Sequence, residues 1–224
     1  MPGAGADGIV GMTAVRTLLI GDVLLRAVET EGRQVLHDCL PRPQSSDALG
    51  RVLSDFSIHP PSGFTGPADA HVVAGAHRDG ERGVWIEVGP VRPDTTWAGP
   101  GPGPGPGPGA DADADPPAVR LALLGKPYAQ PLTFTAREVE DAGRTLGRWR
   151  ASVARWARSP SRPVPEEILQ GAARAIGDNL DTPALLGVLH EVEGSSGVPD
   201  GARFETFAHV DRVLGLDLTR EVGR

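Results

Sequence analysis

The sequence contains one cysteine and one lysine, and both scarcities exclude particular chemistry. Cys39 alone cannot form an intramolecular disulfide or supply a zinc site that needs several cysteines. Lys126 is the only lysine, so the other 21 basic residues are all arginines. No segment of this chain can therefore present two lysines to the phosphates of a nucleotide.

Aromatic residues and long apolar runs are scarce as well. Aromatics make up 4% and hydrophobic residues 39% of the chain, so we expect a modest core built from Leu, Val and Ala. The best apolar run, Leu18–Leu25, is interrupted by Asp22 and is much shorter than the roughly 20 residues of a membrane helix. We therefore expect a cytoplasmic protein without a membrane span, starting at either Met1 or Met12.

The formal net charge of −7 disfavours a general nucleic-acid-binding protein, and no DNA partner is expected. A local basic stripe could still contact RNA despite this overall charge. The arginine excess, together with 30 glycines and 22 prolines, indicates a GC-rich coding sequence. These features say more about the genome than about the function.

Glycine and proline alternate over Pro100–Pro108, and an acidic repeat follows over Ala110–Asp115. Proline removes backbone donors and glycine adds unfolded-state entropy, so this stretch is predicted to be a disordered linker. The expected division is a disordered N-terminal extension over 1–11, an α/β (Rossmann-like) region over 12–97, the linker over 98–115 and a helical bundle over 116–220.

The region before the linker has a mixed α/β pattern. Apolar residues over Val15–Leu25 predict a helix that ends near Gly32, and Asp47–Phe56 predicts a second, shorter helix. Short apolar runs predict three strands. These are Gln34–Leu36, His71–Ala74 and Val84–Val88.

The region after the linker is almost wholly helical in pattern. Thr135 and Glu138 have the spacing of a capping box, and a long helix is predicted from there to about Arg158. One apolar stripe runs along this helix at alternating steps of three and four residues, so the helix must pack on others. The stripe consists of Val139, Ala142, Leu146, Trp149, Val153 and Trp156.

Three more helices are predicted after the long one. Pro165 starts the first, Thr182 and Pro183 fit an N-cap and first turn for the second, and the third runs from about Ala202 to Gly215. Short connections between about four helices are typical of a bundle. Their predicted inward residues are Ile168, Leu169, Ala172 and Ile176, then Leu185, Leu186, Leu189 and Val192, then Phe204, Phe207, Val210 and Leu214.

Three stretches of the helical region resemble a known family. They are Val119–Leu124 with Tyr128 and Pro131–Phe134, then Asp178–Leu189, then Val210–Leu218. Together they resemble the helical bundle that follows the catalytic domain of cysteinyl-tRNA synthetases. Arg16–Arg26 resembles the helix after the "HIGH" signature of class I synthetases. The resemblance implies an α/β remnant of a class I nucleotide-binding domain followed by a mainly α-helical bundle.

The resemblance implies ATP and zinc as cofactors, but the motifs that bind them are not found. Gly11–Ala14 stands where the "HIGH" signature is expected, and the "KMSKS" loop would need two lysines. The family's zinc ligands are cysteine, histidine and glutamate, and a single cysteine, Cys39, cannot supply the usual pair of cysteine ligands. The sequence ends soon after Leu218, so we expect the family's small anticodon-reading module to be absent. We therefore predict no catalytic residues, no bound cofactor and no metal.

Four arginines of the long predicted helix form a candidate tRNA-binding stripe. At 100° per residue they fall within about a 40° arc, roughly opposite the apolar stripe. They could contact RNA phosphates, or they could form an ordinary solvated face. The stripe consists of Arg137, Arg144, Arg148 and Arg155.

Two other groups of chemistry-bearing residues are weaker candidates, and neither is predicted to be a site. The first group matches no established metal-ligand spacing. It consists of His71, His77, Asp79, Glu81 and Glu87. In the second, Cys39 lies beside His37 and Asp38, where neighbouring side chains rarely meet as a nucleophile and its base.

Three functions remain open from the sequence. The first is a synthetase-like protein without aminoacylation activity that binds tRNA or a synthetase partner through its bundle. The second is a diverged ATP-dependent cysteine or aminoacyl ligase with a rebuilt site. The third is a non-catalytic interaction subunit or a decaying paralogue. A thin α/β region would expose sheet edges, so we also expect a protein partner over residues 12–97.

Overall fold

The structure is a computed structural model that describes residues 11–39, 46–75, 82–93 and 115–224. The predicted N-terminal extension lies outside these residues except for Gly11. The predicted linker likewise lies outside them except for Asp115.

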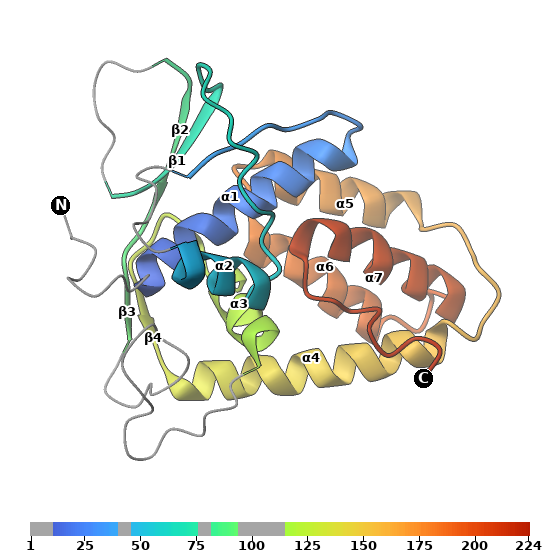
Figure 1. Cartoon of the computed structure of the whole chain (residues 1–224). Helices are drawn as coiled ribbons and strands as arrows, with labels where there is room; N and C mark the ends of the chain where they lie inside the picture. The colour runs from blue at the N-terminus through green and yellow to red at the C-terminus, as the bar shows by residue number, and fades with distance from the viewer. Residues whose placement is uncertain (1–10, 40–45, 76–81, 94–114) are drawn as a thin grey trace.

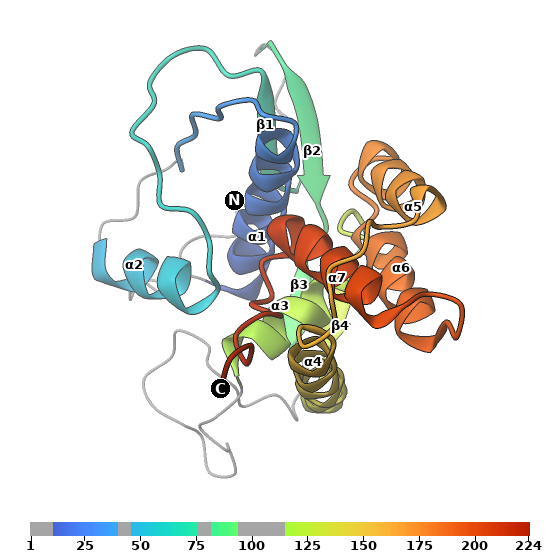
Figure 2. The ribbon, with the colours of Figure 1, turned by 90° about the vertical axis from the view of Figure 1, so that its right-hand side faces the viewer.

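Seven helices and four short strands form the described part of the chain (Figures 1 and 2). The helices are α1 (Met12–Thr30), α2 (Ser46–Asp55), α3 (Pro116–Leu124), α4 (Ala136–Trp156), α5 (Glu166–Gly177), α6 (Thr182–Gly194) and α7 (Asp200–Leu214). The strands are β1 (Ala70–Ala74), β2 (Val84–Val88), β3 (Val91–Pro93) and β4 (Leu132–Phe134). The molecule is thus a small α/β part joined to a helical bundle, as the sequence predicts.

The long helix α4 begins and packs as predicted. The Thr135 hydroxyl accepts a hydrogen bond from the Glu138 backbone N–H at 3.2 Å, and the Glu138 carboxylate accepts one from the Thr135 N–H at 3.1 Å. Every member of the predicted apolar stripe is buried. Trp149 and Trp156 both meet the edge of Phe207 from α7, with ring centroids 5.7 and 5.1 Å apart.

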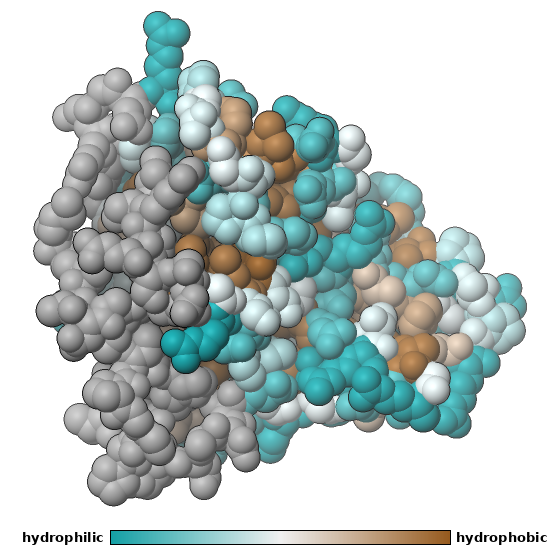
Figure 3. Space-filling model, in the orientation of Figure 1, coloured by the Kyte–Doolittle hydropathy of each residue, from teal (hydrophilic) through white to brown (hydrophobic). Residues whose placement is uncertain are grey.

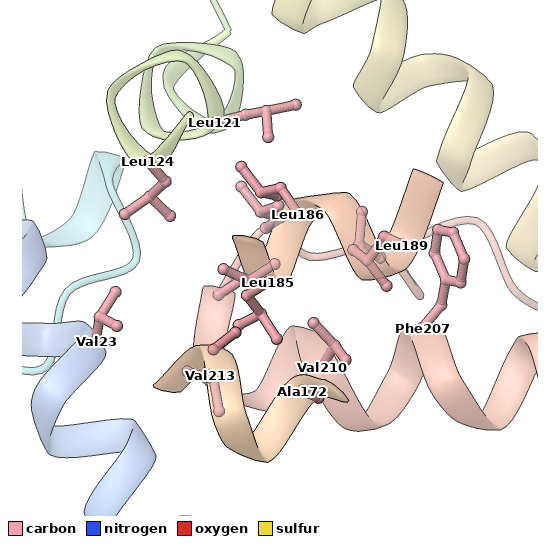
Figure 4. Packing of buried hydrophobic residues seen from close by; sticks show 14 of the residues in the cluster. Val23, Leu121, Leu124, Ala172, Leu185, Leu186, Leu189, Phe207, Val210 and Val213 are labelled. Atoms are coloured by element: carbon pink, nitrogen blue, oxygen red, sulfur yellow. The ribbon is translucent and has the colours of Figure 1, made fainter. Parts of the chain in front are cut away.

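Helices α3 and α7 pack on α4, α6 packs on α7 and reaches α4 through Glu193, and α5 packs on α6 and α7. Figure 4 shows Leu185 and Leu186 of α6 lying between the leucines of α3 and the valines of α7, with Leu189 next to Phe207. Gly215 ends α7 with φ of +60°, a conformation that glycine adopts without strain. The predicted bundle is therefore confirmed.

The start of α6 differs by one residue from the prediction. Asp181, not Thr182, is the N-cap, and its side chain accepts the Ala184 backbone N–H at 2.9 Å. The Thr182 hydroxyl instead donates to the Leu124 carbonyl of α3 at 2.7 Å, and its side chain is buried. Thr182 therefore joins two helices, a role that a local capping pattern does not reveal.

The α/β part holds two parallel sheets of two strands each. In the first, β1 pairs with β2 so that His71 lies opposite Trp85. In the second, β3 pairs with β4, which comes after the predicted linker, and Val91 lies opposite Leu132. The predicted strand over Gln34–Leu36 is wrong, because those residues have no regular secondary structure.

The parts of the chain before and after the predicted linker share their apolar cores. In one cluster, Val23 of α1 and Val88 of β2 pack with residues of α3 to α7. In the other, Leu19 and Phe56 pack with Val119 and Phe134. The helical bundle therefore contributes side chains to the same apolar clusters that bury α1 and the strands. None of the helices in the described ranges is long and apolar enough to cross a membrane.

Candidate functional site

The predicted arginine stripe lies on the exposed side of α4. The Arg137 side chain is 88% exposed and lies 4.0 Å from the carboxylate of Asp141. Arg144 donates to the same carboxylate from one turn further along the helix. Both pairs are solvent-exposed, so each contributes little to stability and can be exchanged for another anion.

Arg148 has a firmer partner than the other stripe residues. Its Nε and Nη2 donate to the two oxygens of Glu193 in α6 at 2.9 and 3.3 Å. Trp149 donates its ring N–H to the same carboxylate at 3.0 Å. Burial would raise the pKa of Glu193, but these hydrogen bonds and the nearby positive charge hold it below its ordinary value. Glu193 therefore stays ionised beside the stripe.

Arg155 completes the stripe near the C-terminal end of α4. Its guanidinium donates weakly to the Ser152 hydroxyl at 3.4 Å and lies 5.8 Å from the ring centroid of Trp156. The four positive charges of the stripe and the two negative charges of Asp141 and Glu193, its carboxylate partners, add up to a charge of +2. In Figure 3 hydrophilic residues gather over the lower right of the molecule, where Figure 1 places α4 and the end of the chain.

A buried ion-pair cluster lies where α1, α3 and the segment after α2 meet. The Asp22 carboxylate accepts hydrogen bonds from Arg120 at 2.6 Å and Arg26 at 2.7 Å. It also accepts from the backbone N–H of His59 at 3.0 Å and lies 2.7 Å from the His59 Nδ1. Burial would raise the pKa of Asp22, but the two arginines and the His59 N–H lower it.

Arg120 is fully buried at the centre of this cluster. Its Nε donates to the Leu214 carbonyl and its Nη1 to the Phe56 carbonyl, both at 2.6 Å. Burial lowers the pKa of Arg120, and the carboxylate of Asp22 opposes that shift. Arg120 was not among the site residues predicted from the sequence. The only indication in the sequence that Arg120 is buried is its position within the apolar run of α3. Apolar residues surround it on every side of that helix.

Two further buried arginines have the same kind of environment. Arg16 of α1 donates to the carbonyls of Gln130 at 2.7 Å and Pro127 at 2.8 Å. Arg150 of α4 donates to the Leu216 carbonyl at 2.8 Å. The three buried arginines therefore satisfy carbonyl oxygens of irregular segments, which would otherwise be buried without partners.

Comparison with known proteins finds two kinds of similar protein, and both are ligases named for cysteine. No family model matches the chain. It is 36% identical over 109 residues to the L-cysteine:1D-myo-inositol 2-amino-2-deoxy-alpha-D-glucopyranoside ligase of Streptomyces griseus, which covers 46% of this chain and 25% of the relative. It is 36% identical over 77 residues to the cysteine–tRNA ligase of Rhodospirillum rubrum, covering 34% of this chain and 16% of the relative. Over about half its length, the chain is cysteinyl-tRNA synthetase-like.

The chain thus spans about a quarter of the length of the first of these synthetase-like relatives. Among the described residues, no three His, Cys, Asp or Glu side chains lie together as a metal site would need. Burial, aided by Asp38, raises the pKa of the Cys39 thiol, which opposes the thiolate that a ligand or nucleophile needs.

The other weak candidates also have structural partners. His71 stacks on Trp85 with ring centroids 4.3 Å apart, and its Nε2 lies 3.0 Å from the Arg82 carbonyl. Glu87 lies on β2, while His77, Asp79 and Glu81 fall outside the described residues. His37 reaches the His59 carbonyl through its Nε2 at 3.3 Å. The structure shows no contact between the rings of His37 or His71 and the Cys39 thiol.

The residues at the position of the ATP-binding signature have packing roles instead. Met12 is buried, and the Thr13 hydroxyl exchanges hydrogen bonds with the backbone of Val91, donating to the carbonyl at 3.3 Å and accepting the N–H at 2.9 Å. Lys126 pairs with Glu138 at 3.1 Å. These residues join α1 to β3 and the segment before β4 to α4.

Proposed function

We propose that this synthetase-like protein does not aminoacylate tRNA but binds it in the cytoplasm, through the arginine stripe of α4. The observation that carries the proposal is the shared orientation of Arg137, Arg144, Arg148 and Arg155 on one exposed side of a straight, six-turn helix. Arginines spaced one or two turns apart match the repeated phosphates of an RNA backbone. Their carboxylate partners are exposed or half-buried, so phosphates can replace them.

The first test is a titration of the full chain with total tRNA and with isolated cysteine tRNA at several salt concentrations. Affinity should fall linearly with the logarithm of salt concentration. The double variant Arg144→Ala/Arg148→Ala should weaken binding and reduce the slope by about 1.4 to 1.8, as two phosphate contacts are lost. No binding at low salt would rule the proposal out.

The chain offers a matched control of equal charge change. Arg158 and Arg174 are exposed and lie outside the stripe, so Arg158→Ala/Arg174→Ala removes two positive charges without touching it. This control should leave the salt slope nearly unchanged. Asp141→Asn should tighten binding, because it releases Arg137 and Arg144 from their common carboxylate. An equal loss in both double variants would show that only overall charge matters.

A second candidate function is the ATP-dependent joining of cysteine to an amino acceptor. It is favoured by the relatives from Streptomyces griseus and Streptomyces scabiei, because their names give an amino sugar as the molecule that is joined to L-cysteine. Cysteine-dependent exchange of pyrophosphate into ATP, followed by amide formation with a glucosaminyl-inositol acceptor, would establish it. Loss of exchange in Lys126→Ala would locate that activity near the only lysine.

The expected protein partner over residues 12–97 stays a prediction. Leu36 and Val84 are large apolar side chains in this region that are 54% and 64% exposed. Val84 begins β2, which pairs only with β1 among the described residues, so one edge of that strand is available to a partner. Cross-linking of the full chain, followed by mass mapping of the linked peptides, would identify such a contact.

A further inference from the structure

A cleft of about 240 Å³ lies beside the buried ion-pair cluster, between the C-terminal half of α1 and α7. It is lined by Arg26, Glu29, Thr30, His59 and Arg212. Two arginines and a histidine line this space, and none of them belongs to the α4 stripe. Ligand pockets for drug-sized molecules begin at about 300 Å³, so the cleft suits one small group.

The cleft has unused hydrogen-bond donors. Arg26 donates through Nε to Asp22 at 2.7 Å and through Nη2 to the Ser57 carbonyl at 2.6 Å, while its Nη1 has no partner in the described ranges. Arg212 is exposed and forms no hydrogen bond or ion pair within those same ranges. One guanidinium is therefore fixed in position, and the other is available to close on a ligand.

The buried carboxylate also orients the third donor. An ionised Asp22 can only accept hydrogen bonds, so the His59 Nδ1 at 2.7 Å carries the proton. This leaves Nε2 as the second nitrogen of the ring. Nε2 donates a hydrogen bond only when the ring carries a second proton, and it accepts one when the ring is neutral.

From this geometry we infer that the cleft binds a phosphate group. The two guanidiniums, joined by Nε2 when the His59 ring is protonated, offer donors from three residues, which suit the three oxygens of a phosphate group better than the two of a planar carboxylate. Glu29 at the lining reduces the positive potential, so binding is weak and specific to a well-placed dianion. The inference is independent of the RNA proposal, since none of these residues belongs to the α4 stripe.

The test follows the ring signals of His59 by NMR in the full chain, at fixed pH and ionic strength. His59→Gln assigns the signals among the six histidines. Inorganic phosphate should shift them saturably, and Arg212→Ala should weaken the affinity about tenfold, as one charge-assisted contact is lost. Arg212 has no hydrogen-bond or ion-pair partner in the part of the chain that the structure describes, so we expect this variant to keep the fold. Glu29→Gln should tighten binding about twofold to threefold.

The controls separate phosphate binding from general charge effects. Arg174→Ala removes an exposed arginine that does not line the cleft and should leave the titration unchanged. Acetate should cause no saturable shift. A tRNA titration decides the source of the phosphate: a shift of the His59 signals assigns the cleft to RNA, and its absence beside a phosphate response assigns it to a free phosphate. No response to phosphate, an equal response to acetate, or an unchanged affinity in Arg212→Ala would overturn the inference.

Discussion

The helical bundle and the α/β part of the molecule are held by different kinds of side chain. In the bundle, one continuous apolar stripe of α4 meets α6 and α7, and its tryptophans pack against Phe207. In the α/β part, the strands are three to five residues long, and irregular segments run between them. There Arg16 of α1 and Arg120, which reaches in from α3 of the bundle, fill the interior and donate to the carbonyls of those segments.

The difference follows from what each part has to bury. Helices satisfy their own backbone groups, so apolar side chains account for most of their packing, and the buried Arg150 of α4 serves carbonyls of the irregular segment after α7. Irregular segments bring unpaired carbonyl oxygens with them, and a buried guanidinium with five donors can satisfy several at once. The bundle should therefore tolerate conservative apolar substitutions, whereas the α/β part should fail when one arginine is removed.

The largest effect is expected from Arg120→Met. The substitution keeps an apolar stem but leaves Asp22 with a weaker set of donors and the carbonyls of Phe56 and Leu214 without partners. Removing one partner of a buried pair costs about 3–5 kcal/mol. Urea unfolding followed by circular dichroism would measure this loss. The control Arg137→Ala, at an exposed position, should stay within about 0.5 kcal/mol of the wild type.

A double variant tests whether the pair or the individual residues matter. Asp22→Asn/Arg120→Met removes both charges, so its cost should be clearly less than the sum of the two single substitutions. Strict additivity would show that Asp22 and Arg120 stabilise the fold separately and would contradict the coupling described here.

Acid should weaken the same cluster by a smaller amount, because a protonated carboxyl still accepts some hydrogen bonds. The pKa of Asp22 is lowered from its ordinary value of 3.8. Its contribution is therefore fully present above that value and is lost as the pH falls through the folded-state pKa. Carbon-13 NMR titration of the Asp22 carboxyl would measure this pKa directly. Titration at or above the ordinary value would show that burial, and not the arginines, dominates.

A matched pair of substitutions probes the bundle. Trp149→Phe removes a donor that serves the Glu193 carboxylate at 3.0 Å, whereas the ring N–H of Trp156 is buried without a partner. Both changes remove a similar volume from the same stripe. Trp149→Phe should therefore cost about 1.5 kcal/mol more than Trp156→Phe in urea unfolding. Equal losses would mean that the Trp149 hydrogen bond adds nothing to the packing.

The bundle could be predicted from the sequence because its information is local and periodic. The stripe of α4 and the Thr135 capping box each lie within one helix, and both are confirmed. The pairing of β3 with β4 could not be predicted, since three-residue strands on either side of the Gly/Pro-rich stretch carry no periodic signal. Gln34–Leu36 has strand-like residues but no partner strand, so its local preference did not decide its structure.

The candidate site residues also differ in how far they could be predicted from local sequence. The α4 stripe could be found from helical spacing, because its residues share one element. The Arg26, His59 and Arg212 cleft combines α1, the segment after α2, and α7, which only the tertiary fold brings together. The pairing of Arg148 with Glu193 on another helix was hidden for the same reason.

The smallest of these effects concerns the start of the bundle. Thr135→Ala removes the hydroxyl that accepts the Glu138 N–H, which leaves one donor of the first turn of α4 to water. The expected loss is about 1 kcal/mol, and Thr135→Ser should recover most of it. Hydrogen exchange of the first-turn amides of α4 should accelerate in Thr135→Ala while that of the Trp149 amide stays unchanged. Acceleration along the whole helix would instead show that the cap controls the bundle, and that the apolar stripe alone does not hold it.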